Sequence, residues 1–521
     1  MSVRPLPEAF QPYAWAPPLA EIAARHGLNP AQIIRFDQNV PALPGIPQVS
    51  LGESFARLND YPDGTYRELR EAAAAYAGVE WEQIVPGAGA AGLIGLAART
   101  FLAPGRRACV FPPTYPVYAI ASGIEGAAVS HDPGGADLIW VCNPNNPTGE
   151  LIDPEKIAEL ARAHPGAAVV VDEAYFEYGG KTAAPLVAGT PNLVVLRTLS
   201  KAFGLAALRV GYAIASAEVA RELDRRRDPA PVSAPSARIA AAALRNPRLD
   251  VEETVAERER MREALVAAGF DCPPSAGNFV VVRGADRAEE LEAQGLVVRR
   301  QPAAFRITVR LAAENDRILA ALGAAPTPSA VRSSLVLRTT AETALRISLV
   351  LDGRGRFRAD TGIGFLDHLL AQLAHHGSFD LDLAAGGDLD VDEHHTVEDV
   401  LAALGDALTA ALGDRAGVTR YGAATVPMDE ARASAAVDLV RRPHAEVSLA
   451  FRGERVGGLA LTLLPHALER FAMQAGITLH VEASGEDDHH VAEAAFKALG
   501  RALRQACSLA GVASGSTKGA L

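Results

Sequence analysis

The sequence predicts two folded parts: an α/β part with a mostly parallel sheet, then an α+β part built from two similar halves. Three observations lead to this expectation. Short apolar runs alternate with Ala-rich helical segments up to about residue 325, as expected for parallel strands with crossover helices. The stretch LGAAPTPSAVRSS (322–334) then combines two prolines with small and polar residues, which favours a linker. Beyond the linker, strands and helices alternate at shorter intervals, and one histidine pattern occurs twice.

These features set the expected domain boundaries at 1–325 and 334–521, with a linker at 326–333. The 521 residues are enough for several cores of ~150 residues each. The net charge of -12 is dispersed, without a run of five or six Lys or Arg. We therefore expect neither nucleic acid nor a membrane surface as a partner.

Cysteine usage and hydropathy indicate the compartment. The four cysteines are scattered without CxxC spacing, which is typical of a reduced interior. The N-terminus lacks the apolar core of a signal peptide, and no stretch approaches ~18 uncharged apolar residues. We therefore expect a cytoplasmic protein that is neither exported nor membrane-spanning.

Three motifs mark the α/β part: NPNNPTG (143–149), DEAY (172–175) and TLSKAFGLAALRVGY (198–212). Asp172 ends a valine run at the carboxyl edge of a buried strand, where a carboxylate needs a cationic partner. Lys201 follows Ser200 in a tight loop and can form an imine beside a bound phosphate. Taken alone, Lys201 could be an ordinary solvated lysine, and Asp172 could be an ordinary helix-capping aspartate. Together and in this order, they predict a site in which Asp172 pairs with a pyridinium nitrogen.

Over residues 30–322 these motifs resemble the fold-type I pyridoxal-phosphate aminotransferases, specifically histidinol-phosphate aminotransferase. The resemblance implies a mixed, mostly parallel sheet with a small C-terminal subdomain, and pyridoxal 5'-phosphate as cofactor. It also implies that Lys201 is the Schiff-base lysine and Asp172 the partner of the pyridine nitrogen. The other implied cofactor contacts are Asn146 and Tyr175 at the phenolic oxygen, Tyr115 on the ring, Ser200 and Arg209 at the phosphate, the amides of the Gly87–Ala90 loop with Ala88 and Gly89, and Tyr61 at the neighbouring subunit's cofactor.

The same resemblance implies a dimer, through Tyr61, and substrate binding by Arg299 and Arg306 in VVRRQPAAFRIT. One stretch departs from the family, because GAGAAG stands where a more polar GNGSDE-like loop is usual. Phosphate binding there would rest on main-chain N–H groups. Since these motifs report the cofactor more than the substrate, a decarboxylase or an aminotransferase of different specificity stays open.

The α+β part carries ten of the 13 histidines, in a repeated arrangement. FLDHLLAQL is followed by DEHHTVED in the first half, and LPHALERFA by DDHHVAEAAFK in the second. The lone histidine precedes the first paired histidine by 26 residues in one half and by 23 in the other. This near-match predicts an internal duplication of one metal-binding half-domain.

Helix geometry predicts two metal centres. In each HHxxE the first histidine and the glutamate share a helix face, whereas the second histidine points about 100° away and must serve another ion. A single HH pair is more often solvated, but a duplicated HHxxE favours ligands. One expected site comprises His368, His395, His489 and Glu493, and the other His466, His394, Glu398 and His490. Whether each set meets within one chain or between subunits stays open. Three imidazoles and one carboxylate suit octahedral Mn²⁺, although affinity alone favours Zn²⁺ or Cu²⁺.

The pieces RTTAET, LDGRG, TGIGFLDHLL, HHTVEDV, TRYGAATVPMDEA, ITLH, HHVAEAAFKAL and STKGAL resemble imidazoleglycerol-phosphate dehydratase. The resemblance implies a duplicated half-domain fold like domain 2 of ribosomal protein S5, the same crossed ligand sets with two Mn²⁺ ions per site, and a high oligomer. Implied substrate contacts are Glu342, His376, Arg420, Arg442, Lys497, Ser516, Thr517 and Lys518. DLVRRP replaces the usual SGRP, so Arg441 is an alternative to Arg442. Glu342 is the candidate for proton transfer, with His376 or a metal-bound water as alternatives.

The two resemblances predict consecutive reactions of histidine biosynthesis. Dehydration of imidazole glycerol phosphate gives imidazole acetol phosphate, a ketone that an aminotransferase converts with glutamate into histidinol phosphate. We therefore expect a bifunctional, homo-oligomeric enzyme whose partners are small phosphorylated imidazoles and glutamate. The alternatives are a dehydratase fused to an aminotransferase or decarboxylase of other specificity, and a metal-binding oligomerisation module without activity.

Overall fold

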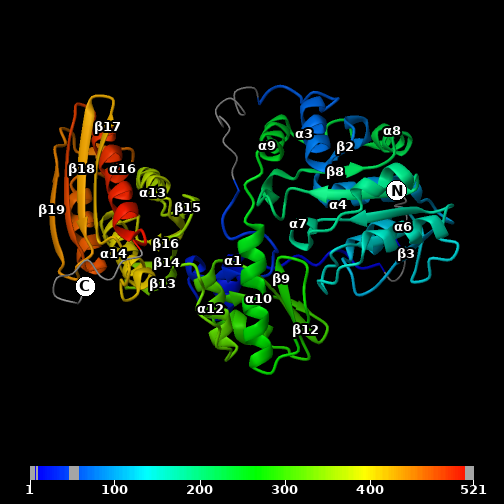
Figure 1. Cartoon of the computed structure of the whole chain (residues 1–521), viewed down its shortest axis with the longest axis horizontal. Helices are drawn as coiled ribbons and strands as arrows, with labels where there is room; N and C mark the ends of the chain where they lie inside the picture. The colour runs from blue at the N-terminus through cyan, green and yellow to red at the C-terminus, as the bar shows by residue number, and fades with distance from the viewer. Residues whose placement is uncertain (1–5, 7–9, 46–57, 511–521) are drawn as a thin grey trace. The chain divides into compact units, whose positions relative to one another are not determined.

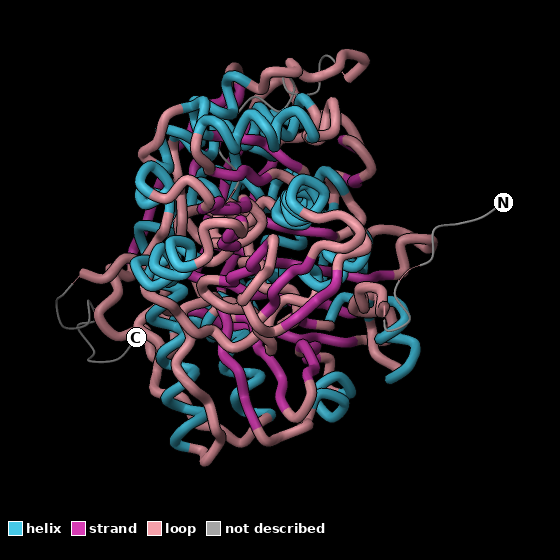
Figure 2. Tube along the Cα trace, turned by 90° about the vertical axis from the view of Figure 1, so that its right-hand side faces the viewer, coloured by secondary structure: helices cyan, strands magenta, loops and turns pink. Residues whose placement is uncertain are grey.

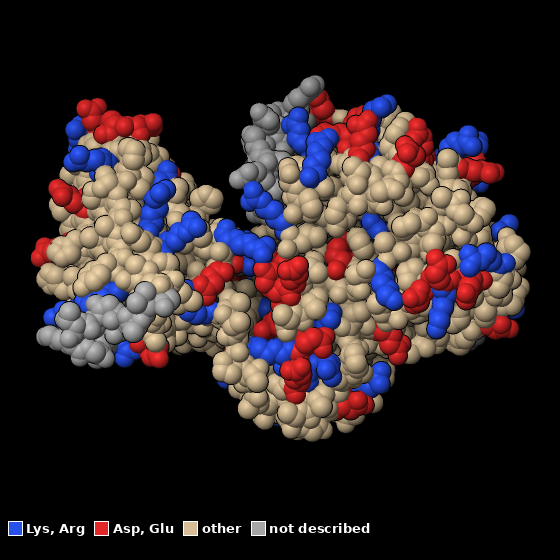
Figure 3. All heavy atoms as spheres, in the orientation of Figure 1, with Lys and Arg blue, Asp and Glu red and all other residues tan. Residues whose placement is uncertain are grey.

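The computed structural model describes residue 6, residues 10–45 and residues 58–510. The chain forms two compact units, each assembled from three segments. The first unit is Met1–Ala16, Phe36–Ala288 and Val298–Val309, and the second is Pro17–Arg35, Glu289–Val297 and Arg310–Leu521. Among the described residues, none of the helices combines the length and apolar character that crossing a membrane requires. Basic and acidic side chains are intermingled over the face seen in Figure 3.

A seven-stranded sheet forms the centre of the first unit, in the order β2-β8-β7-β6-β5-β3-β4 (Figure 1). β8 runs antiparallel to β2 and β7, and all other neighbouring strands are parallel. The strands are β2 (Ile84–Gly87), β3 (Arg107–Val110), β4 (Ala128–Ser130), β5 (Leu138–Cys142), β6 (Ala168–Asp172), β7 (Leu193–Thr198) and β8 (Gly211–Ile214). The predicted mixed, mostly parallel sheet is confirmed.

Helices cover both faces of this sheet, so strands lie between helices in Figure 2. Side chains of α3, α6 and α9 pack on one face, and those of α4, α5 and α8 on the other. Every residue of β6 is consequently buried, which explains its run of valines. The helices are α3 (Arg67–Ala77), α4 (Gly89–Phe101), α5 (Val117–Ile124), α6 (Pro154–Ala163), α7 (Phe176–Gly179), α8 (Ala217–Arg226), α9 (Ala234–Arg245) and α10 (Val251–Ala267).

A smaller antiparallel sheet in the first unit has the order β11-β12-β9. Its strands are β9 (Phe279–Arg283), β11 (Arg299–Gln301) and β12 (Ala304–Thr308). Arg299 and Arg306 lie opposite each other in the register of β11 and β12. The two arginines predicted to bind substrate are therefore cross-strand neighbours.

The second unit begins with short segments that precede the duplicated part. They are α1 (Leu19–His26), β1 (Ile34–Arg35), α11 (Ala288–Ala293), β10 (Leu296–Val297), α12 (Ala312–Ala321) and the 3-10 turn η1 (Pro30–Gln32). β1 pairs in parallel with β10. No helix or strand lies between α12 and β13, where the linker is predicted.

Two four-stranded sheets of the same design follow, in the orders β13-β14-β16-β15 and β17-β18-β22-β19. In each sheet, two of the three pairs of neighbouring strands are antiparallel and one is parallel. The first half comprises β13 (Ser333–Thr339), β14 (Thr343–Val350), β15 (Phe357–Asp360), α13 (Gly364–Gly377), β16 (Asp380–Gly387) and α14 (His394–Leu412). The second comprises β17 (Tyr421–Met428), β18 (Ala431–Asp438), β19 (His444–Leu449), the short hairpin β20 (Arg455–Val456) and β21 (Leu459–Ala460), α15 (Leu463–Ala475), β22 (Thr478–Ser484) and α16 (Asp488–Cys507).

The helices of the two halves are α13 to α16, and Figure 1 shows α13, α14 and α16 between the two sheets. Their apolar residues share one core with the inward side chains of both sheets. Because both halves have the same order of elements apart from the short hairpin β20–β21 in the second, the predicted internal duplication is confirmed.

Candidate active sites

Asp172 lies at the carboxyl end of β6, beside the end of β7, which leads into Lys201. The Tyr118 hydroxyl donates a hydrogen bond to Asp172 Oδ2 at 2.8 Å, and the Ala174 amide donates to Oδ1 at 3.1 Å. Burial raises the pKa of Asp172 to about 6, although these hydrogen bonds and the Lys201 charge oppose that rise. The arrangement is a buried carboxylate prepared to meet a cation.

Lys201 carries an amine close to these groups. Its Nζ donates to the Gln38 carbonyl at 3.1 Å and lies 5.6 Å from the centre of the Tyr175 ring. Burial lowers the pKa of Lys201 to about 7, and the Arg306 charge acts in the same direction. A large fraction of the amine is therefore neutral near pH 7, as a nucleophile requires.

Tyr175, Asn146 and Arg306 form a second group of side chains near the amine. Asn39 Nδ2 donates to the Tyr175 hydroxyl at 3.0 Å, and burial raises the pKa of Tyr175 to about 12. Arg306 Nη1 donates to Asn146 Oδ1 at 2.5 Å, and its Nη2 donates to the Asp37 carbonyl at 2.8 Å. These two hydrogen bonds fix the buried Arg306 guanidinium at the site.

A backbone cradle for a phosphate lies at the start of α4. Gly89 has φ +70°, and a Cβ on it would lie 2.9 Å from Arg209 Nη2. A Cβ on Gly211 would lie 3.0 Å from the Gly89 carbonyl carbon, so β8 also approaches the loop closely. Ser200, which directly precedes Lys201, is buried, and its Oγ accepts a hydrogen bond from Thr198 Oγ1 at 3.0 Å. A helix N-terminus, a cation and side-chain-free backbone suit pyridoxal phosphate, so the residues fit the expected cofactor.

Aromatic rings border the same region. Tyr115 contacts Tyr118 edge to face, with ring centres 5.7 Å apart, and Tyr13 at 6.2 Å. Arg299 Nη2 donates to the Ala14 carbonyl at 3.0 Å, and its guanidinium lies 5.9 Å from the Tyr13 ring centre. The N-terminal segment therefore lies against both predicted contacts. Tyr61, the residue expected to reach a second subunit, is 91% exposed.

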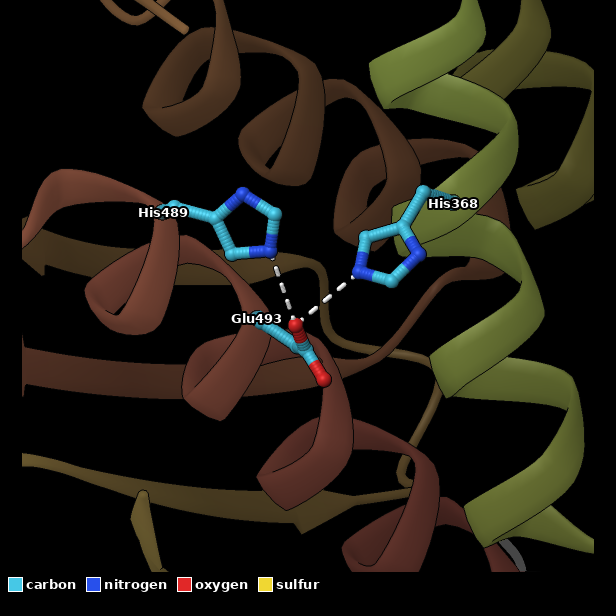
Figure 4. Close-up of side chains that lie close together, drawn as sticks. All are labelled: His368, His489 and Glu493. Atoms are coloured by element: carbon cyan, nitrogen blue, oxygen red, sulfur yellow. Dashed lines mark hydrogen bonds and ion pairs between the residues drawn. The ribbon is translucent and has the colours of Figure 1, made fainter. Parts of the chain in front are cut away.

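In the second unit, α13 and α16 bring His368, His489 and Glu493 together (Figure 4). Their nearest ligand atoms lie within 4.8 Å of one another. His368 Nε2 is 2.9 Å and His489 Nε2 is 3.1 Å from Glu493 Oε2. Burial opposes ionisation of Glu493, but Lys497 and His368 hold its pKa at about 2. Two imidazoles and an ionised carboxylate converging on one point suit a divalent cation.

The duplicate cluster comes from α14 and α15. His394, Glu398 and His466 have ligand atoms within 4.8 Å of one another. Glu398 Oε2 is 3.4 Å from His394 Nε2 and 3.3 Å from His466 Nε2, while Arg470 Nε is 2.8 Å from its Oε1. Six of the eight predicted metal ligands thus form two matched triads.

The two remaining predicted ligands, His395 and His490, lie outside these triads. His395 Nδ1 is 3.0 Å from Asp388 Oδ2, and His490 Nδ1 is 2.9 Å from Glu430 Oε2. Each bond raises the pKa of its histidine. A carboxylate on Nδ1 fixes the imidazole and leaves Nε2 for another partner, as metal-binding histidines require. Their allocation to the two centres stays a prediction.

The predicted substrate residues of this unit are spread around the triads. Lys497 Nζ lies 2.7 Å from Glu493 Oε1, and exposed Glu342 acts electrostatically on His395. Arg420 Nε pairs with Asp438 at 2.7 Å. The remaining predictions are placed as follows: His376 is partly buried in the last turn of α13, Arg442 is exposed after β18, Arg441 donates to the Gly413 carbonyl, and Ser516, Thr517 and Lys518 lie outside the described residues.

Several site residues were not found from the sequence. Tyr118 lies three residues after the predicted ring contact Tyr115, but only its contact with Asp172 reveals a role. Asn39 and Tyr13 belong to no motif and reach the site from the N-terminal segment. Glu430 lies within the quoted stretch TRYGAATVPMDEA, but nothing in that stretch shows its contact with His490, and Asp388 carries no sequence signal beyond its charge. Such contacts depend on tertiary structure, so one sequence does not identify them.

Comparison with protein families gives two matches. The model for aminotransferase class I and II matches residues 33–133 and 123–322, and the model for imidazoleglycerol-phosphate dehydratase matches residues 361–503.

Individual relatives divide in the same way. The imidazoleglycerol-phosphate dehydratase of Magnetococcus marinus is 50% identical over 189 residues, which are 35% of this chain and 95% of that protein. The histidine biosynthesis bifunctional protein HisB of Stenotrophomonas maltophilia is 49% identical over 37% of this chain, but the match spans only 54% of that protein. The crystal structure of histidinol-phosphate aminotransferase from Sinorhizobium meliloti in complex with pyridoxal-5'-phosphate has a TM-score of 0.53 at 25% identity, covering 60% of this chain and 96% of that one.

Proposed function

Because this chain belongs to the aminotransferase class I and II family in its N-terminal part and to the imidazoleglycerol-phosphate dehydratase family in its C-terminal part, we propose that it catalyses two consecutive steps of histidine biosynthesis. The C-terminal part dehydrates imidazole glycerol phosphate to imidazole acetol phosphate. The N-terminal part transfers an amino group from glutamate to that ketone and forms L-histidinol phosphate. The likeness to the Sinorhizobium meliloti enzyme supports this choice of substrate.

The observation that carries the proposal is the presence of both sites in one chain: an amine beside a buried acid, and paired triads of histidine and glutamate. The product of the second site is a ketone, which is the acceptor that the first site needs. Chemical continuity therefore selects the aminotransferase substrate.

In the aminotransferase part, pyridoxal phosphate supplies when bound an electron-withdrawing ring that stabilises charge at the substrate carbon. Asp172, held by Tyr118, keeps a negative charge where the ring nitrogen would lie. Lys201 has a pKa of about 7, so it can accept a proton and return it near neutral pH. Arg306 and Arg299 would bind the substrate's anionic groups, because guanidinium groups form paired hydrogen bonds to carboxylate and phosphate.

In the dehydratase part, the triads would hold Mn²⁺, which supplies Lewis acidity at the nitrogens of the substrate imidazole. His395 and His490, each fixed by a carboxylate, are proposed to complete the two ligand sets. Glu342 would move the substrate proton, since its carboxylate is exposed and its charge acts on His395. Arg420, Arg442 and Lys497 provide positive charge for the phosphate. The aminotransferase dimer and the higher oligomer of the dehydratase are part of the same proposal.

A coupled assay on the full chain tests both activities. The protein is supplied with pyridoxal phosphate, Mn²⁺, imidazole glycerol phosphate and glutamate, and histidinol phosphate and 2-oxoglutarate are measured. We expect both products in equal amounts. Lys201→Ala should accumulate imidazole acetol phosphate, while His489→Ala should form histidinol phosphate only from added imidazole acetol phosphate. Absence of both imidazole acetol phosphate and histidinol phosphate with the unaltered chain would contradict the dehydratase, and rapid amination of phenylpyruvate but not of imidazole acetol phosphate would contradict the aminotransferase assignment.

A further inference from the structure

A buried cluster of charged residues in the second unit has no part in either proposed reaction. It joins α12 to the sheet of the first dehydratase half. Glu314 of α12 and Asp382 of β16 are both fully buried. The guanidinium groups of Arg310, Arg346 and Arg358 surround them. The residues of α12 lie within the aminotransferase family match, which ends at 322, whereas β14, β15 and β16 belong to the dehydratase sheet.

Glu314 is the centre of the contact. Its Oε2 accepts from Arg310 Nε at 2.7 Å, and its Oε1 accepts from Arg346 Nη1 and from the Ser348 hydroxyl, both at 3.1 Å. Arg346 and Ser348 both come from β14. A helix of the aminotransferase family match is therefore held on the first dehydratase sheet by one carboxylate.

Asp382 extends the cluster across the sheet. It accepts from Arg346 at 3.0 and 3.3 Å and from Arg358 Nε at 2.9 Å. Arg310 lies 3.6 Å from the same carboxylate. Burial opposes ionisation of Asp382, but Arg346 and Arg358 hold its pKa below the usual range. Charges buried in this way are tolerated only when each is paired, so every member depends on the others.

A second contact lies on the same sheet. Gln32 of η1 donates to the Arg338 carbonyl at 3.2 Å and to Thr339 Oγ1 at 2.8 Å, both at the end of β13. A Cβ on Gly386 of β16 would lie 3.5 Å from Asn29 Oδ1. Segments before β13 therefore cover this sheet at two places.

The internal duplication provides a comparison within the molecule. β14 and β18 occupy the same position in the two sheets, but β14 is buried at all of its residues whereas buried and more exposed residues alternate along β18. The outward residues Arg346 and Ser348 correspond in the sheet order to Ser434 and Ala436, which line an open hollow of about 520 Å³. Only the first sheet carries α12.

We propose that α12 is a structural element of the dehydratase, so that in this chain the two catalytic parts are coupled through a shared, cooperatively folded segment from Arg310 to Gly387. The dehydratase of Magnetococcus marinus matches this chain over 95% of its own length, which leaves no room in it for an aminotransferase part. The coupling is thus a property of the fused chain. It lies beyond the proposed function, because it does not depend on which reactions the two sites catalyse.

Hydrogen exchange of the full chain, with pyridoxal phosphate and Mn²⁺ present, tests the coupling. In the unaltered protein, amides of α12, β14 and β16 should exchange with the same dependence on low urea concentrations, which marks one opening unit. Glu314→Gln keeps the shape and removes the charge. It should speed exchange of all three elements by roughly a hundredfold or more, as loss of one partner from buried ion pairs predicts. β18 and β22 should keep their protection. Arg317→Gln, an exposed change on the same helix, is the control and should alter none of them.

Faster exchange of α12 alone, or a different urea dependence of α12 and β14 in the unaltered chain, would overturn the proposal. Equal loss of protection in both sheets would also overturn it, because the effect would then be general unfolding. The urea comparison needs no substitution, so a variant that fails to fold leaves the test intact. Neither measurement depends on catalysis, and failure of the proposed function would not change it.

Discussion

Tyr118→Phe tests whether a tyrosine that contacts no expected substrate group controls the cofactor site. Its hydroxyl donates to Asp172 Oδ2 at 2.8 Å, and both residues are buried. The ring stacks on Trp140 with centroids 5.2 Å apart and planes 16° from parallel. Phenylalanine keeps that stacking and removes the hydroxyl, which is hydrogen-bonded to Asp172 and also to the Cys142 thiol.

The size of the effect follows from the charge of the acceptor. A hydrogen bond to an ionised group is worth about 1.5–3 kcal/mol, and one pKa unit corresponds to about 1.4 kcal/mol. The pKa of Asp172, already about 6 through burial, should therefore rise by about one to two units. The sign is fixed, since removing a donor destabilises only the ionised form. At pH 7 a smaller fraction of Asp172 would carry the charge that meets the pyridine nitrogen.

Cofactor affinity is the measurement. We expect the dissociation constant of pyridoxal phosphate at pH 7 to rise about two- to tenfold, from titrations of the apoprotein followed by absorbance, and the increase to shrink toward pH 9. Tyr76→Phe is the matched control, because Tyr76 hydrogen-bonds the buried carboxyl of Glu177, which is not a predicted cofactor contact. An unchanged affinity in Tyr118→Phe, or an equal loss in Tyr76→Phe, would refute the reasoning.

Three further results are expected. Cofactor uptake needs the neutral Lys201 amine, so the rate of uptake should rise with pH, reach half its plateau near the pKa of about 7 and level off above it. Stopped-flow absorbance measures this rate, and a midpoint of the pH profile near 10 would disprove the expectation. Gly89→Ala should weaken pyridoxal phosphate binding about tenfold, because a left-handed Ala costs about 1–2 kcal/mol and its Cβ meets Arg209. Gly78→Ala, with φ +69° and open space around it, should leave that affinity unaltered. Glu493→Gln should lower bound Mn²⁺ per chain by about half in elemental analysis, and full retention would argue against that ligand.

The fold could be predicted where one pattern determines one structure. The valine run of β6 indicated a central strand because both of its faces are covered by helices. The repeated histidine spacing indicated two half-domains, and both sheets have the same strand order. Glu314 carried no such signal. A glutamate in the first turn of a helix is ordinary on a surface, and only the packed structure shows that it is buried.

The sites could be predicted where chemistry fixes residue type and spacing together. His489 and Glu493 lie one helical turn apart because two ligands to one ion must share a helix face. Tyr118 and Asp172 are 54 residues apart, and Asn39 and Tyr175 are 136 apart. Their contacts depend on how strands and loops pack, which leaves no fixed interval in the sequence.

The two dehydratase halves show how far a duplication keeps its copies alike. The triads agree in residue type and arrangement, since the first histidine and the glutamate of each HHxxE must stay one helical turn apart to share an ion. The outward faces of β14 and β18 differ, because what a sheet carries there depends on what packs against it. Arg346 and Ser348 face Glu314 on one copy, and the other copy has Ser434 and Ala436 beside an open hollow. Conserved spacing therefore reports the chemistry of a half-domain, and divergence of its outer face reports the element that covers it.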